Sequence, residues 1–113
     1  RCVQFFPQPA AAVAQAQALL AAGGLLILTG LELFHDPRAK AARVAHSLRS
    51  HRQRYGFELF LRPTKGYLDL ADKEQLEAQG VQIKPYWQLL PANLKALLRP
   101  TLPRHCYGVC GHA

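Results

Sequence analysis

The sequence has only three cysteines, and all of them stand near the ends of the chain: Cys2, Cys106 and Cys110. A small secreted domain that depends on disulfides carries more cysteines, in an even number and at regular spacings. That class is therefore not indicated, and we expect free thiols in a cytoplasmic protein. The 113 residues are enough for one modest core.

Residue patterns that carry catalysis are also missing. We find no nucleophile spaced with a base and an acid, no glycine-rich phosphate loop and no pair of carboxylates. We therefore expect no enzyme activity and no cofactor. The candidate metal ligands are His105, Cys106, Cys110 and His112. All four lie within eight residues, too close together for the usual two pairs of zinc ligands with a spacer, so we expect no metal.

Charge is absent from residues 10–31, a length that fits the roughly 20 residues of a membrane-spanning helix. Against a span, the stretch is rich in alanine and contains glutamines and the pair Gly23-Gly24. Periodicity instead predicts a helix over 10–22 that ends at these glycines. The apolar run 25–28 is either a buried strand or a linker, and periodicity does not decide between them.

Acidic residues are almost absent from residues 38–65. This segment holds eight lysines and arginines and one acid, Glu58, whereas the remaining residues hold six of each sign. The net charge of +7 therefore lies in about a quarter of the chain. A surface that serves only solubility mixes both signs, so this segment indicates contact with phosphates.

Capping signals place two helices before and within this basic segment. Thr29 is expected to cap a short helix over 30–35. The pair Asp36-Pro37 is expected to begin a longer helix over 37–55, since aspartate is a favoured cap and proline a favoured first helical residue.

The segment after the basic helix alternates imperfectly between apolar and polar residues. It predicts a β-hairpin over 57–70, with a turn at 63–66. We expect Phe57 and Phe60 to lie in the core and Tyr67 to anchor the hairpin.

The last third of the chain has weaker but readable signals. Asp72 is expected to cap a helix over 73–79, and residues 81–84 alternate like a short strand. Pro91 is expected to open a last amphipathic helix. The tail RHCYGVCGHA, from Arg104, is expected to be a loop.

Helix, short helix, longer basic helix and hairpin, in this order, describe a winged helix-turn-helix. Residues 37–49, PRAKAARVAHSLR, and 57–70, FELFLRPTKGYLDL, resemble the N-terminal DNA-binding domain of biotin-operon repressor/ligases. Response-regulator output domains have a similar ending. The shared features are Leu48-Arg49 and Lys65-Gly66-Tyr67-Leu68. The resemblance implies that the basic helix enters the major groove and that the wing lies along the backbone or the minor groove.

We therefore predict an α+β fold with a winged helix-turn-helix domain over 1–71. Its recognition helix is 37–55 and its wing is 57–70. Residues 72–113 are predicted to form a helical and extended extension that packs on this domain and offers a surface for a homodimer or another partner. The predicted nucleic-acid-binding residues are Arg38, Lys40, Arg43, His46, Ser47, Arg49, Ser50, Arg54, Arg62 and Lys65.

The preferred interpretation is a DNA-binding protein that regulates transcription or a mobile element, with double-stranded DNA as its partner and no membrane contact. A second interpretation, from another class, is a structural or adaptor subunit of a larger nucleoprotein or protein complex. A third is a small subunit with a single membrane span over 10–31.

Overall fold

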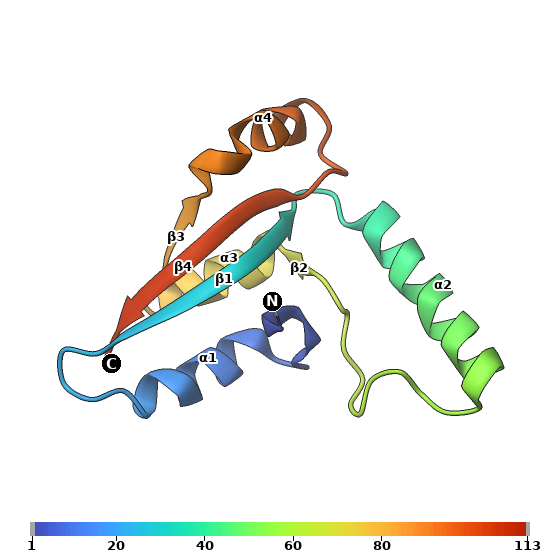
Figure 1. The fold of residues 1–113 in the computed structure, drawn as a ribbon, viewed down its shortest axis with the longest axis horizontal. Coiled ribbons are helices and arrows are strands. Elements are labelled where there is room, and N and C mark those ends of the chain that lie inside the picture. The colour runs from blue at the N-terminus through green and yellow to red at the C-terminus, as the bar shows by residue number, and fades with distance from the viewer. Residues whose placement is uncertain (1, 113) are drawn as a thin grey trace.

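The computed structural model describes residues 2–112 and shows a mixed α+β fold (Figure 1). The elements, in chain order, are η1 (Val3–Phe5), α1 (Pro9–Ala18), β1 (Leu25–Phe34), α2 (Arg38–Tyr55), β2 (Leu68–Asp69), α3 (Leu70–Ala78), β3 (Gln82–Pro85), η2 (Trp87–Leu89), α4 (Leu90–Leu98) and β4 (Arg104–Gly111). The strands form one sheet in the order β2-β1-β4-β3.

The antiparallel pair β1–β4 is the centre of the sheet. It runs from the Leu25–Gly111 pair to the Leu33–Arg104 pair, so the end of β4 lies beside the start of β1 (Figure 1). β3 pairs antiparallel with the other edge of β4, and β2 adds a short parallel contact to β1. Strands from both expected parts of the chain, 1–71 and 72–113, therefore share one sheet.

The predicted loop over the C-terminal tail is wrong, because residues 104–111 form β4. Cys106, Gly108 and Cys110 alternate towards the core, while the residues between them are only half-buried. This alternation is hidden in the sequence by small residues. The partner strand is also far away along the chain, so no local signal marks it.

The predicted short helix over 30–35 is also wrong, because β1 continues through these residues. The pairing with β4 shifts between Leu28 and Leu31, and Gly30 has a φ of +67°. A glycine adopts this backbone angle at little cost, and the resulting bulge keeps Leu28, Leu31 and Leu33 all buried. Of the two alternatives for residues 25–28, a strand or a linker, the strand is therefore the one observed.

Residues 10–31 are divided between α1 and β1 and form no single helix. Among the helices of residues 2–112, none is both long enough and apolar enough to cross a membrane.

The core lies between one face of the sheet and the elements η1, α1 and α3. Val3, Val13 and Leu76 reach it from these three elements, in that order. They meet leucines of β1 and the two cysteines of β4. Figure 1 shows α3 crossing behind β1 and β4. On the opposite face, Leu25 and Ile27 remain exposed.

Five predicted elements are confirmed. The helices α2, α3 and α4 and the strand β3 show small shifts of their ends. The predicted helix over 10–22 is present as α1, but it ends at Ala18, before the glycine pair that was expected to end it. Asp69 rather than Asp72 is the N-cap of α3, and the two carboxylates share a reciprocal capping box.

The predicted hairpin over 57–70 is wrong. Residues 57–67 contain no strand, and the two residues of β2 pair in parallel with β1 instead. The residues at 63–66 favour a turn locally. The segment that contains them, however, contacts residues 4–6, which precede α1 and are far away in the sequence. The Thr64 hydroxyl lies 3.2 Å from the carbonyl oxygens of Gln4 and Phe6. A winged helix-turn-helix is therefore not confirmed.

Gly108 offers a test of how tightly the core is packed. A methyl group added there would lie 2.9 Å from Val81 Cγ1 and 3.4 Å from Leu28 Cδ1. We expect Gly108→Ala to lower the free energy of unfolding by about 1–3 kcal/mol, since overpacking forces core side chains to move. Urea unfolding measures this change.

Gly111→Ala is the matched control in the same strand, because its methyl would meet only the Gly24 carbonyl oxygen, at 3.9 Å. We expect this variant to be neutral or slightly stabilised. Equal unfolding midpoints for both variants would contradict the packing described for β4.

Candidate nucleic-acid interface

α2 stands apart from the sheet. It has 18 residues and none of them is buried. Figure 1 shows it projecting away from the end of β1. Its base is held by the Asp36 backbone N–H, which donates to the Pro100 carbonyl oxygen at 3.0 Å. Its end is set by Gly56, which adopts the left-handed conformation and donates its N–H to the Arg52 carbonyl oxygen.

One narrow stripe of α2 faces the rest of the protein. It is made of half-buried small and apolar side chains, namely Ala41, Val44, Ala45 and Leu48. The outer positions Arg43, His46 and Ser50 are exposed. The helical spacing of Ala41, Ala45 and Leu48 thus marks the inner face, which makes only partial contact. Arg52 and Tyr55 continue the same spacing but are exposed.

Basic side chains occupy both flanks of the exposed surface of α2, and no acidic residue lies in the helix. At about 100° per residue, Arg38 and Arg49 fall on one flank, whereas Arg52 falls in line with Ala45 of the inner stripe. Lys40, Arg43 and Arg54 fall on the other. The outward band between the flanks carries His46, Ser50 and Gln53. We call this exposed surface the α2 basic surface.

Some of the predicted cations have acidic partners inside the protein. The Arg38 guanidinium lies 2.7 Å from the Asp36 carboxylate, and the hydrogen bond from Arg38 lowers the pKa of Asp36 to about 2. Lys65 Nζ lies 3.0 Å from the Asp69 carboxylate and 2.7 Å from the Asp72 carboxylate. The positive charges of Arg38 and Lys65 are therefore partly neutralised by aspartates of the same chain.

Other predicted cations lack an acidic partner in the part of the chain that the structure describes, although Lys40 Nζ lies 5.9 Å from the centre of the Phe34 ring and Arg54 lies 5.5 Å from that of Tyr55. Among residues 2–112, no carboxylate lies within ion-pair distance of Lys40, Arg43, Arg49 or Arg54. Arg52, which was not predicted as a site residue, makes only an exposed contact of 3.4 Å with Glu58. Arg62 is exposed on the 57–67 segment, away from α2.

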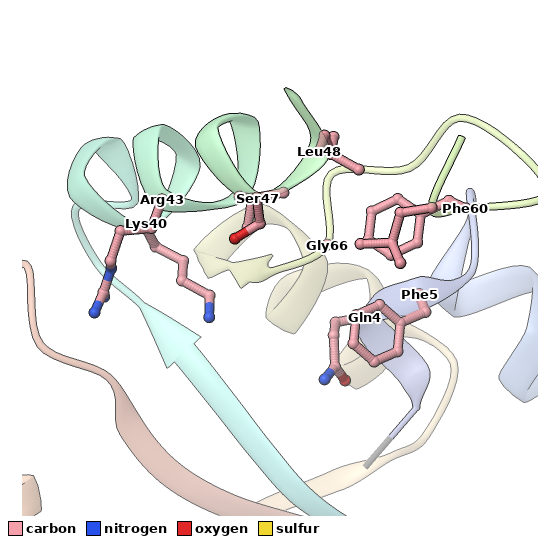
Figure 2. A pocket seen from close by; sticks show the side chains of 10 residues that line it. Gln4, Phe5, Lys40, Arg43, Ser47, Leu48, Phe60 and Gly66 are labelled. Carbon is pink, nitrogen blue, oxygen red and sulfur yellow. The ribbon is translucent and has the colours of Figure 1, made fainter. Parts of the chain in front are cut away.

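A cleft of about 630 Å³ lies under α2, between the helix and the two segments that face it (Figure 2). Its lining residues are Gln4, Phe5, Lys40, Arg43, Val44, Ser47, Leu48, Leu59, Phe60 and Gly66. Figure 2 shows Lys40, Arg43 and Ser47 on the helix, and the rings of Phe5 and Phe60 across from them.

The aromatic wall of the cleft is formed by residues far apart in the sequence. The Phe5 and Phe60 ring centroids lie 5.5 Å apart. The Thr64 contacts with the lead-in bring the two segments together. Gly66 forms the floor, where an added methyl would lie 3.1 Å from Val44 and 3.3 Å from Phe60.

Neither ring was expected at a site. Phe60 lies in the cleft and Phe57 is 63% exposed, so the prediction that both belong to the core is wrong. The sequence holds no signal for the Phe5–Phe60 pair, because only the fold of the 57–67 segment creates it.

The four candidate metal ligands are spread along and just beyond β4. Cys106 and Cys110 point into the core, while His112 is exposed. Burial raises the pKa of both thiols, which disfavours the thiolate form that metals bind. Within residues 2–112, no group of three or more potential ligands is gathered for a metal ion.

Comparisons with protein-family models, with curated proteins and with solved structures found no match for this chain. The function is therefore argued from the site alone.

The Lys65–Asp69–Asp72 network predicts a pH dependence of stability. Burial acts to raise the pKa of Asp69, but the Asp72 backbone N–H and the Lys65 ammonium group together lower it below 3.8. Ionised Asp69 therefore stabilises the fold above its ordinary pKa, and this contribution is lost as the pH falls through the lowered value.

Asp69→Asn removes this charge and keeps an oxygen that can cap α3. We expect the variant to be less stable than the unmodified protein at neutral pH, and the difference to shrink between about pH 5 and pH 3. Urea unfolding at several pH values measures it. Glu74→Gln, on the same helix but outside the network, is the control. A difference that stays constant across this range would contradict the assignment.

Proposed function

We propose that the protein binds double-stranded DNA through the α2 basic surface and acts as a regulator of transcription or of a mobile element. The observation that carries this proposal is a long helix without acidic residues that stands clear of the sheet. A helix that served only solubility would carry charges of both signs, whereas α2 carries positive charges alone.

The arrangement of side chains on α2 suits the major groove. This groove is about 12 Å wide and admits one α-helix. The two basic flanks would lie against the two phosphate backbones. The band between them, with His46, Ser50 and Gln53, would face the base edges. The small side chain of Ser50 allows a close approach, and a histidine or glutamine can exchange hydrogen bonds with bases.

The proposal keeps the helix docking that the family resemblance implies and dispenses with a hairpin wing. Lys65 is less available for DNA than the sequence indicated, because two carboxylates hold it. Arg62 remains exposed on the 57–67 segment and can reach a backbone only if the duplex extends past the end of α2.

A second candidate function, an adaptor subunit, is favoured by a different surface. α4 exposes Leu94, Leu97 and Leu98, the last of them at 85%. Such side chains in one short helix suit a protein partner. This surface does not overlap α2, so both activities are compatible with one molecule.

Salt dependence of duplex binding tests the DNA proposal. The four open cations of α2 predict a log–log slope of affinity against salt of about −4, since each phosphate contact releases condensed counterions. We expect the double variant Arg49→Gln/Arg54→Gln to weaken binding and to reduce this slope by about 2. Fluorescence anisotropy with a labelled duplex measures both quantities.

The matched control is Lys95→Gln/Arg99→Gln, in α4 and at its C-cap, which removes the same charge far from α2 in the sequence. We expect its slope and affinity to stay near those of the unmodified protein. Equal losses in the two variants would mean that net charge alone attracts DNA. Absence of duplex binding at low salt would refute the proposal.

A further inference from the structure

The cleft under α2 has two walls of unlike chemistry. The helix side presents the Lys40 ammonium, the Arg43 guanidinium and the Ser47 hydroxyl. These groups donate hydrogen bonds, and two of them carry positive charge. The facing side presents the rings of Phe5 and Phe60, tilted by 41° to each other.

Both walls are open to a ligand. Phe5 is 48% exposed although it is aromatic and adjoins another ring. Among residues 2–112, neither Lys40 nor Arg43 has a carboxylate within ion-pair distance. One cleft is thus lined by an exposed ring, Phe5, a half-buried ring, Phe60, and two cations without an acidic partner among the described residues.

We propose that this cleft binds a nucleoside monophosphate. The base would lie against Phe5 and Phe60, and the phosphate would accept hydrogen bonds from Lys40, Arg43 and Ser47. Aromatic rings stack with any base, and charged donors bind phosphate oxygens strongly. A volume of about 630 Å³ falls within the range of small-molecule sites, roughly 300–1,000 Å³.

Simpler ligands use only half of the cleft. An inorganic anion would satisfy the cations and leave the rings in water. An apolar molecule would cover the rings and bury cations without a partner, which is costly. A planar base joined to a phosphate is complementary to both walls.

This inference does not rest on DNA binding. Arg49 and Arg54, which test the duplex interface, do not line the cleft. Loss of duplex binding in their double variant leaves the cleft unchanged, so failure of one proposal is distinguishable from failure of the other.

Titration with matched compounds tests the cleft. Adenosine monophosphate, adenosine and inorganic phosphate are each added to the unmodified protein without DNA, and binding is followed by calorimetry and by NMR shifts. We expect the monophosphate to bind at least tenfold more tightly than either of its halves. Equal affinity for phosphate alone, or no binding of the monophosphate at about 1 mM, would overturn the proposal.

Two variants assign the walls. Phe60→Ala is expected to weaken binding of the monophosphate by roughly tenfold, by loss of stacking. Lys40→Gln/Arg43→Gln is expected to weaken binding of the monophosphate by a similar factor and to leave the affinity for adenosine unchanged. The controls are Phe57→Ala, an exposed ring outside the cleft, and Arg54→Gln, a cation of α2 outside the cleft.

Neither Phe60 nor the two cations belong to the core cluster, so these variants are expected to fold, and circular dichroism checks this. Unchanged affinity in folded Phe60→Ala would overturn the assignment of the aromatic wall. Equal losses in Arg54→Gln and in the Lys40/Arg43 variant would show that binding follows general charge and not the cleft.

Discussion

The pairing of β1 with β4 is the contact on which the rest of the structure depends. It joins residues 25–34 to residues 104–111, so that strands far apart in the sequence lie side by side in one sheet. One face of this pair supplies the leucines and cysteines that η1, α1 and α3 cover. The pairing also sets where α2 begins. The chain leaves the sheet after the end of β1, at Asp36, and α2 follows outside the core.

The separation of α2 from the core follows from its composition. Its apolar stripe consists of two alanines, a valine and a leucine, which offer little area to bury. The charged side chains around this stripe would lose their hydration on burial, at a cost that no described acidic surface offsets. The helix therefore rests on the 57–67 segment along one narrow line. That line leaves room for a cleft on one side and exposes the α2 basic surface on the other.

Local signals in the sequence predicted the elements whose ends are defined locally. Gly56 ends α2 and an aspartate caps α3, so these helices were predicted without knowledge of the fold, although the predicted cap of α3 is Asp72 and the observed cap is Asp69. β4 and the second half of β1 were not readable, because each is defined by its partner at the opposite end of the chain. The basic side chains of the candidate site were likewise visible in the charge count. The Phe5–Phe60 wall was not, since its two members stand 55 positions apart and are brought together by the fold, in part through Thr64.

The net charge overstates the number of cations in and around α2 that are free to contact a ligand. Arg38 and Lys65 hold the turn before α2 and the start of α3 through their aspartate partners. Lys40 and Arg43 line the cleft, while Arg49 and Arg54 are not among its lining residues. The one-signed segment thus divides into cations that stabilise the fold, cations that line a cleft and cations on an open helix surface. Because Lys40 and Arg43 line the cleft and also form one flank of the α2 basic surface, a phosphate in the cleft and a DNA backbone would compete for these two side chains. Arg49 and Arg54 would contact the DNA alone.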